Sequence, residues 1–335
     1  MSKPLNWGII STAKIGRVHV IPAMQNCDAI NVMAIASRNL EQASNVAAEL
    51  AIPKAYGSYQ DMFADPEIDV VYNPLPNHLH VPITIEAMEA GKHVLCEKPI
   101  SLTAEQATTL VDVSSRTGKI VEEAFMVRHN PQWLRVVELV KSGAIGTLRA
   151  IQGVFSYYND DPGNIRNMAE IGGGGIFDIG CYLITTSRMV TEEEPSKVAA
   201  IIDFDPTLKT DRLASALMVF PSGVQMTWVC STQLVARQRM TFLGTSGRID
   251  VEVPFNAPND RPCRIFIDDG SDHFGSGLKT ETFPIADQYT LQGEALCRTI
   301  RDDGPVTVSL ENSIANMRVI DAVFKAGKTG QWVDV

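Results

Sequence analysis

Residues 5–17 read LNWGIISTAKIGR, and this stretch decides the fold. Residues 5–10 form an apolar run with the length and composition of a buried strand. Small and polar residues follow, and Gly16 then opens a segment that can form a helix. A strand, a tight turn and a helix in this order are typical of the start of an open, doubly wound parallel sheet.

The same alternation continues to about residue 126. Amphipathic segments such as residues 40–50 and 81–90 separate short apolar runs rich in β-branched residues. Near-continuous apolar strands that alternate with helices predict a parallel sheet covered on both faces. The expected strands are residues 5–11, 30–37, 69–75, 92–98 and 119–126.

The pattern changes after residue 126. A helix is expected over residues 131–142, and longer alternating runs follow, with hairpins predicted in residues 216–229 and 239–253. Two more helices are expected over residues 288–301 and 312–326. A chain of 335 residues exceeds the size of one hydrophobic core. We therefore predict two domains, a Rossmann domain in residues 1–124 and an α+β domain with a large, mostly antiparallel open sheet in residues 125–335.

The composition excludes several classes of protein. A net charge of −10 argues against a nucleic-acid partner, because binding to phosphates needs a basic face. The chain has no apolar run of about 18 residues and no secretory signal, so we expect a cytoplasmic protein that does not bind membranes. Its six cysteines are scattered, which predicts reduced and mostly buried thiols. His78 and His80 have no companion ligands in the sequence, and no metal is predicted.

The turn after the first strand is the expected place for a dinucleotide, because a pyrophosphate there meets the N-terminus of a helix. Aligned on the G-x-G-x-x-G fingerprint, this chain has Ser11, Ala13 and Gly16, so only the last glycine is present. The match is weak alone, and the order of strand, turn and helix strengthens it. The residues expected at the pyrophosphate are Ser11, Thr12, Ala13, Lys14 and Ile15.

The second predicted strand ends in Ser37 and Arg38, where an NAD enzyme usually has an acid that binds the ribose 2′-hydroxyl. A guanidinium beside a hydroxyl suits a 2′-phosphate instead. We therefore predict NADP over NAD. The alternative is that Arg38 is a solvated residue that opens the next helix.

Residues 93–100 read HVLCEKPI and place a charged pair at the carboxyl end of a strand. Ligands of open α/β sheets bind beyond these ends, so Glu97 and Lys98 should face the cofactor. Pro99 restricts Lys98 to extended geometry and can adopt the cis form. The alternative is a surface salt bridge.

Four motifs together resemble one family: EKP, PLPNHLH (residues 74–80), EEAFMVRHNPQW (122–133) and GGGGIFDIGCY (172–182). The chain resembles the glucose-fructose oxidoreductase, inositol dehydrogenase and rhizopine-catabolism (Gfo/Idh/MocA) family over nearly its whole length. Within the family it is most similar to the branch of D-xylose dehydrogenase, glucose-fructose oxidoreductase and dimeric dihydrodiol dehydrogenase, which has tyrosine where inositol dehydrogenases have histidine.

The resemblance implies the catalytic residues. In the D-x-G-x-[YH] motif of the family, the matching residues are Asp178, Gly180 and Tyr182. Tyr182 corresponds to the acid/base, Lys98 to its partner, and Asp178 orients Lys98 or a substrate hydroxyl. A nearby ammonium favours the phenolate that a proton acceptor requires. Without the resemblance, Tyr182 would be a partly buried aromatic that packs on its own helix.

The resemblance also implies further cofactor contacts. Leu75, Pro76, Asn77 and His80 would line the nicotinamide pocket, and Arg166 in the sequence NIR would reach cofactor or substrate. Gln42 stands where several NADP-dependent relatives have lysine, so use of both NAD and NADP stays open.

The expected function is an NAD(P)-dependent oxidoreductase that acts on a sugar or polyol, most simply an aldose such as xylose or glucose. The alternatives are a trans-dihydrodiol dehydrogenase and a non-catalytic nucleotide-binding regulator of the same fold. A homodimer or larger homo-oligomer is expected, because the exposed face of the second sheet is usually an interface in this family.

Overall fold

The computed structural model describes residues 3–302 and 304–335, and contacts divide the chain into two compact units. The first unit runs to Met126 and also contains Tyr289–Met317, and the second contains Val127–Gln288 and Arg318–Val335. The sequence-based division had placed all residues after 124 in the second domain. Tyr289–Met317 belongs with the first unit because its helix contributes Leu296 and Cys297 to the first unit's core. Independent folding of the two domains stays a prediction.

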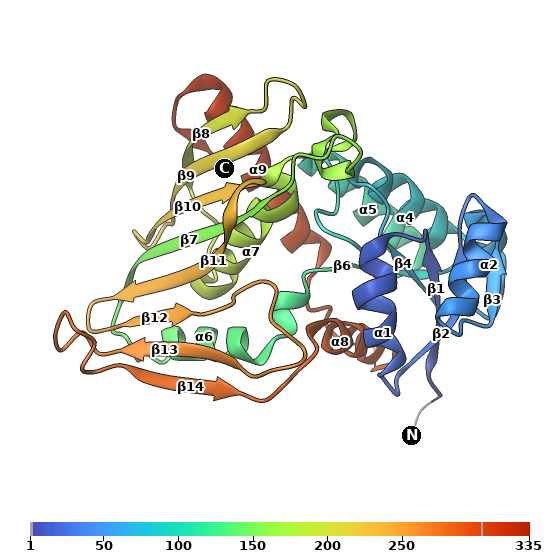
Figure 1. Cartoon of the computed structure of the whole chain (residues 1–335), viewed down its shortest axis with the longest axis horizontal. Coiled ribbons are helices and arrows are strands. Elements are labelled where there is room, and N and C mark those ends of the chain that lie inside the picture. The colour runs from blue at the N-terminus through green and yellow to red at the C-terminus, as the bar shows by residue number, and fades with distance from the viewer. Residues whose placement is uncertain (1–2, 303) are drawn as a thin grey trace. The chain divides into compact units, whose positions relative to one another are not determined.

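The first unit contains a parallel sheet in the order β3-β2-β1-β4-β5-β6 (Figure 1). This order confirms the predicted Rossmann architecture. All five predicted strands are present, and the additional β3 is a half-buried run of three residues, too short for an alternation to be visible. The strands are β1 Leu5–Ile10, β2 Ile30–Ala36, β3 Lys54–Tyr56, β4 Val70–Asn73, β5 His93–Cys96 and β6 Val121–Glu123.

Side-chain caps begin several helices of this unit. Asn39, Ser58 and Thr103 each accept a hydrogen bond from the backbone amide three residues later, which satisfies a donor that the helix leaves unpaired. The helices are the π-helix η1 Gly16–Val20, α1 Ile21–Gln25, α2 Leu40–Glu49, α3 Tyr59–Phe63, the 3₁₀ turn η2 Asn77–Leu79, α4 His80–Glu89, α5 Ala104–Thr117 and α8 Gln288–Asp302.

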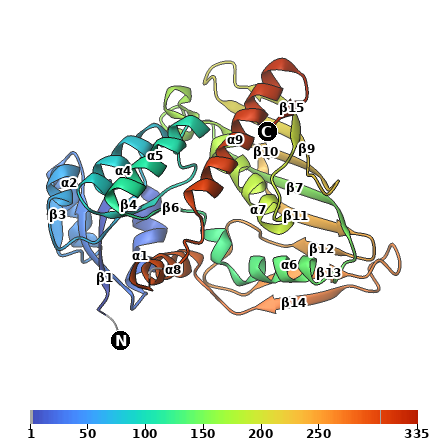
Figure 2. The same ribbon diagram turned by 180° about the vertical axis from the view of Figure 1, so that it is seen from behind.

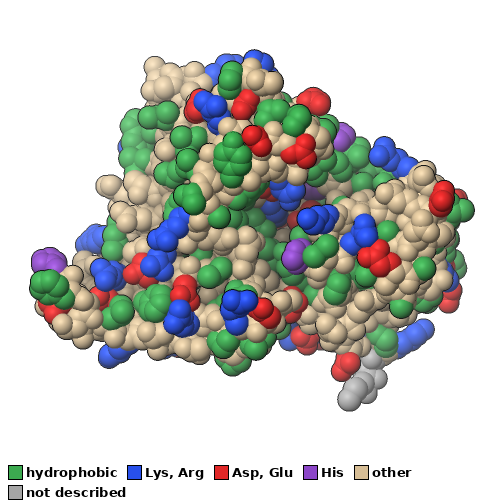
Figure 3. Space-filling view, in the orientation of Figure 1, with side chains coloured by type: hydrophobic (Ala, Val, Ile, Leu, Met, Phe, Trp, Pro, Cys, Tyr) green, Lys and Arg blue, Asp and Glu red, His purple; other side chains and the backbone are tan. Residues whose placement is uncertain are grey.

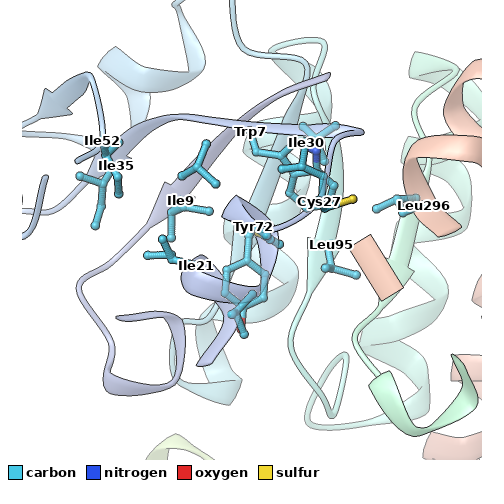
Figure 4. Close-up of a cluster of buried hydrophobic side chains, with 14 of the residues drawn as sticks. Trp7, Ile9, Ile21, Cys27, Ile30, Ile35, Ile52, Tyr72, Leu95 and Leu296 are labelled. Carbon is cyan, nitrogen blue, oxygen red and sulfur yellow. The ribbon is translucent and has the colours of Figure 1, made fainter. Parts of the chain in front are cut away.

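The core of the first unit lies between β1, β4 and the helices. Trp7, Ile9 and Tyr72 are fully buried, and Leu296 of α8 lies close to Cys27 (Figure 4). Burial of such side chains contributes about 1.5–3 kcal/mol each. The carboxyl ends of the parallel strands are thereby held on one rigid edge.

The second unit is a sheet in the order β14-β13-β12-β11-β7-β10-β9-β8-β15. Neighbouring strands pair antiparallel except β7 and β10, which are parallel, so the prediction of a mostly antiparallel sheet is confirmed. Both predicted hairpins are present. The strands are β7 Leu148–Tyr158, β8 Lys197–Phe204, β9 Asp211–Val219, β10 Gln225–Ser231, β11 Gln233–Gly244, β12 Arg248–Val251, β13 Cys263–Asp268, β14 Lys279–Phe283 and β15 Val333–Asp334.

One face of this sheet carries helices. Figure 2 shows α6 Pro131–Lys141, α7 Cys181–Thr191 and the later part of α9 Leu310–Thr329, which belongs to this unit from Arg318 on, in front of the strands, whereas Figure 1 looks onto the opposite face. Aromatic rings fill the space under the helices: Phe155 stacks on Phe255 with ring centroids 4.8 Å apart. A π-helix, η6 Ile176–Gly180, directly precedes α7.

Two further sequence predictions concern the state of the cysteines and membrane-spanning segments. The six cysteines are free and buried, as predicted. Within the described residues, no helix is both long and apolar enough to cross a membrane.

Candidate functional site

The turn after β1 has an unusual backbone at Ser11. Its φ is 72°, in the left-handed region that costs an L-residue about 1–2 kcal/mol. Ser11 stands where the dinucleotide fingerprint has its first glycine, so the backbone explains why glycine is common there. The Ser11 hydroxyl accepts a hydrogen bond from the Ala13 amide at 3.0 Å, and the Ser11 amide donates to the Ala36 carbonyl at 2.7 Å.

The residues of this turn fit a dinucleotide phosphate. The side chains from Ser11 to Ala13 are small, and Lys14 is exposed. No described side chain caps η1 at its N-cap residue Ile15, and the Arg17 amide donates to the Ala13 carbonyl at 3.1 Å, so the helical turn begins just after Ala13. Gly16 is buried, and a Cβ there would lie 3.8 Å from the Tyr72 ring. The backbone amides of Thr12, Ala13, Lys14 and Ile15 were expected to bind the pyrophosphate. Of these, the Ala13 amide already donates a hydrogen bond to the Ser11 hydroxyl.

At the end of β2, Ser37 is buried and Arg38 is exposed. The side chain that caps α2 is Asn39, which accepts from the Gln42 amide at 3.1 Å. Opening the helix therefore does not require Arg38. The Ser37 hydroxyl accepts a hydrogen bond from the Asn39 amide at 3.3 Å, which holds the turn beside Arg38.

At the end of β5, Glu97 and Lys98 are half-buried, and the Lys98–Pro99 peptide bond is cis. The Tyr72 hydroxyl of β4 donates to Glu97 Oε1 at 2.7 Å. The backbone amide of Lys98 donates to Glu97 Oε2 at 3.3 Å. Two neighbouring strand ends thus fix the Glu97 carboxylate, and Lys98 follows it directly.

Of the residues predicted after β4, Leu75 is buried and Pro76 and Asn77 are half-buried. His80 is only 1% exposed, and its ring nitrogens lie 2.7 Å from the carbonyl oxygens of Leu75 and Pro99. Burial lowers the pKa of His80 from 6.5 to about 4, whereas the two carbonyl acceptors act against this shift because they favour a ring that carries both N–H donors. This geometry connects the turn after β4 to the loop after β5.

In the second unit, a polar cluster surrounds Asp178 of η6. Arg166 Nε donates to Asp178 Oδ1 at 3.0 Å, and the Tyr157 hydroxyl donates to Oδ2 at 2.5 Å. Burial and the neighbouring Asp178 both raise the pKa of Tyr157, so its hydroxyl remains a donor. Two donors on two oxygens fix the plane of this carboxylate.

Tyr182 lies one turn beyond Asp178, at the start of α7. It is 5% exposed, and its ring packs against Phe155 and Phe255 with centroid distances of 5.9 and 5.6 Å. The aromatic packing limits the orientations of the ring. Asp178 and Tyr182 lie on consecutive helical segments, η6 from Ile176 and α7 from Cys181.

The glycine run before η6 makes close backbone contacts. Gly174 has φ 121°, and a Cβ there would lie 1.8 Å from Asp211 Oδ1. The Gly174 amide donates to the Arg166 carbonyl at 2.8 Å, and the Ile176 amide donates to Asp211 Oδ2 at 2.6 Å. Only glycine allows this approach.

Sequence reasoning missed Tyr157 and Asp211. Tyr157 lies near the end of a strand, one residue before another tyrosine, and Asp211 opens a strand as an ordinary charged residue. Neither position carries a motif, and both contacts are made across the fold. Among residues 3–302 and 304–335, no group of three or more His, Cys, Asp or Glu side chains could hold a metal ion.

Comparison with known proteins places the chain in a family. Residues 5–125 match a family described as an oxidoreductase family with an NAD-binding Rossmann fold, and residues 133–250 match the GFO/IDH/MocA C-terminal domain. An uncharacterized oxidoreductase of Rhizobium meliloti is 46% identical over 331 residues, which covers 99% of each chain. D-xylose 1-dehydrogenase (NADP(+)) 2 of Haloferax volcanii is 34% identical and covers 98% of this chain and 99% of its own.

Solved structures agree with the sequence relatives. A 3-ketoreductase from Actinomadura kijaniata, in complex with NADP and TDP-benzene, matches with a TM-score of 0.90 and 27% identity. The match covers 96% of this chain and 98% of that one. The structures of that enzyme include a tyrosine-to-phenylalanine and a lysine-to-alanine mutant. This chain therefore belongs to the Gfo/Idh/MocA family of oxidoreductases, as its motifs predicted.

Proposed function

We propose that this oxidoreductase uses NADP to oxidise or form a CH–OH group of a sugar or polyol, with an aldose such as xylose or glucose as the first candidate. The observation that carries the proposal is the shared edge of the first sheet. Ser11, Ser37, Glu97 and Lys98 all follow the carboxyl ends of parallel strands, where ligands of such sheets bind.

We assign the chemistry to Lys98, Asp178 and Tyr182. Nicotinamide, when bound, accepts or supplies the hydride. Lys98 donates a hydrogen bond to the reacting oxygen and stabilises its developing negative charge. Tyr182 accepts or returns the hydroxyl proton. Asp178, held by Tyr157 and Arg166, orients a second polar group of the site.

We favour NADP over NAD because of Arg38. Its guanidinium is exposed beside the buried Ser37, and Asn39 rather than Arg38 caps the next helix. The D-xylose dehydrogenase relative is named for NADP, and the 3-ketoreductase was solved with NADP. The contacts proposed for the rest of the cofactor are Thr12–Ile15, Leu75–Asn77, His80 and Arg166, with His80 acting through the carbonyls that it contacts.

The alternatives differ in substrate or in class. A trans-1,2-dihydrobenzene-1,2-diol dehydrogenase of Xenopus laevis is 32% identical and covers 73% of this chain and 74% of its own, which keeps a cyclic diol among the candidate substrates. A regulator without catalysis is the other alternative. The presence of both Lys98 and Tyr182 favours an enzyme.

We also propose a homodimer that forms through the uncovered face of the second sheet. A groove of about 880 Å³ lies on this face, lined by Ile201, Leu217, Thr227 and Arg239 among others. Figure 3 shows hydrophobic side chains interspersed with Lys and Arg on the side of the molecule that it presents. Light scattering of the purified protein tests this state.

Cytoplasmic location stays a prediction, which cell fractionation tests.

The test of the function is the appearance of reduced nicotinamide when the protein meets NADP or NAD with a panel of aldoses, inositols and dihydrodiols. Turnover of an aldose with NADP is the expected result. Lys98→Met should lose turnover and keep cofactor binding, whereas Lys141→Met, which removes an exposed lysine paired with Glu192, should keep both. Full turnover by Lys98→Met would refute the role of Lys98. Cofactor binding without turnover of any substrate would favour the regulator.

A further inference from the structure

Asp211, the first residue of β9, is a carboxylate in an interior position. It is 2% exposed, and its Oδ2 accepts a hydrogen bond of 2.6 Å from the backbone amide of Ile176. Its Oδ1 lies so close to Gly174 that a Cβ on that residue would be 1.8 Å away. The carboxylate is therefore packed directly against the segment that begins η6.

The other side of this segment is held by the loop that carries Arg166. The Gly174 amide donates to the Arg166 carbonyl at 2.8 Å, and a Cβ on Gly173 would lie 2.7 Å from the same oxygen. The Asp178 amide then donates to the Gly174 carbonyl at 3.0 Å, which starts the helix. The glycine turn is thus clamped between a carbonyl and the Asp211 carboxylate.

The position of this clamp decides which side chains it controls. Asp178 lies two residues after Ile176, and Tyr182 lies six residues after it. Both therefore belong to the first helical turns beyond the contact between Asp211 and Ile176. The first amides of a helix have no partner within it, and a carboxylate satisfies them and complements the helix dipole. Loss of that acceptor would let the first turn shift.

Keeping a carboxyl group in this place is costly. Burial and, less strongly, the charge of Asp178 raise the pKa of Asp211 from 3.8 to about 7, although amide donors of the turn act against the shift. Burial and the charge of Asp211 hold the pKa of Cys230, on the adjacent strand β10, well above its usual value. An apolar residue would avoid the cost but could not accept the Ile176 hydrogen bond.

We infer that Asp211 is a positioning residue of the proposed reaction: by anchoring the first turn of η6, it fixes the orientation of Asp178 and Tyr182. The inference rests on the proposed function. Asp211 itself touches neither cofactor nor substrate in this scheme, and its effect passes through the helix.

Three variants test it. Asp211→Ala removes the acceptor, and Asp211→Asn keeps an oxygen that can accept from Ile176. Asp203→Asn is the control, because Asp203 is an exposed aspartate of the same sheet that pairs with Arg212. Hydrogen exchange of residues 172–183 and the kinetic constants are measured for each.

We expect Asp211→Ala to accelerate exchange in residues 172–183 and to lower kcat about tenfold or more, because small displacements of reacting groups are that costly. The Kd of NADP should change much less than kcat, since the proposed cofactor residues other than Arg166 belong to the first unit. Asp211→Asn should restore most of the protection and most of kcat, and the control should match the wild type.

The two hypotheses fail separately. Exchange does not require turnover, so protection of residues 172–183 in Asp211→Ala equal to wild type would overturn the anchor even in an inactive protein. Faster exchange with unchanged kcat would overturn the positioning role. Absence of turnover in the wild type, with exchange accelerated as expected, would reject the proposed function and leave the anchor in place.

Discussion

Replacement of Asp211 by Asn should change how stability depends on pH. The carboxyl has a pKa of about 7 in the folded protein and about 3.8 when unfolded, because burial favours the neutral form. Between these values the folded state holds a proton that the unfolded state has released. The free energy of unfolding therefore falls as pH rises, by about 1.36 kcal/mol per pH unit, and this contribution becomes constant above the folded pKa.

The magnitude follows from the same two values. Between pH 5 and 7 the carboxyl accounts for a loss of about 2.3 kcal/mol, because the slope flattens near the folded pKa, and over the whole interval for about 4 kcal/mol as an order of magnitude. Asn cannot ionise, so the variant lacks this contribution. We expect the stability difference, wild type minus Asp211→Asn, to decrease by about 2–3 kcal/mol from pH 5 to pH 8.

The assay is urea unfolding followed by tryptophan fluorescence at several pH values, with linear extrapolation to water. Trp133, Trp228 and Trp332 lie in the second unit, so the signal reports mainly on the unit that contains Asp211. Taking the difference between two proteins removes the titration of all other groups, and Asp203→Asn controls for the loss of one surface carboxylate. A difference that stays constant from pH 5 to 8, or that grows, would refute the reasoning.

Three shorter predictions concern the candidate site. Ser11→Gly and Ser11→Ala both lose the hydroxyl that accepts a hydrogen bond from the Ala13 amide, but only glycine adopts the left-handed backbone without strain. The glycine variant should therefore be more stable than the alanine variant by about 1–2 kcal/mol in thermal unfolding, and equal stabilities would contradict this. Tyr157→Phe removes a 2.5 Å hydrogen bond to Asp178, a loss of about 1.5–3 kcal/mol for a charged acceptor, and kcat/KM should fall about tenfold or more; an unchanged value would exclude a role for this bond. Arg38→Ala should weaken NADP about tenfold or more and leave NAD unchanged in binding titrations, whereas equal effects on both would remove the argument for the 2′-phosphate.

The first unit could be predicted from sequence because its signals are local. Buried parallel strands are continuous apolar runs, and each of the five expected runs became a strand. The strand that was missed, β3, is three half-buried residues at the sheet edge, where neither burial nor alternation leaves a pattern. The packing of α8 on the first unit was also missed, since a helix carries no mark of which core its apolar face joins.

Part of the candidate site could be predicted from the sequence. Residues that a local pattern places at a strand end were expected, whereas contacts between residues far apart in the sequence were not. Glu97 and Lys98 were expected at a strand end, because the ends of parallel strands share one edge of the sheet. The Tyr157 hydroxyl reaches Asp178 across 21 residues, and Asp211 reaches Ile176 across 35. Such pairs depend on strand order and register in the second sheet, and no local pattern encodes them.

The two turns that carry the candidate site each contain a residue with a positive φ, and the residue differs between them. After β1, the chain places Ser11 in left-handed geometry and uses its hydroxyl to engage the Ala13 amide, so a side chain offsets part of the strain. Before η6, Gly174 has a positive φ and also lies against Asp211, which leaves no room even for a methyl group. A departure from glycine is therefore tolerable where the new side chain can accept a hydrogen bond from the turn's own backbone. Where a buried carboxylate packs directly against the turn, only glycine fits. The glycine run in the sequence therefore marks the place where Asp211 holds the helical segment that carries Asp178 and Tyr182.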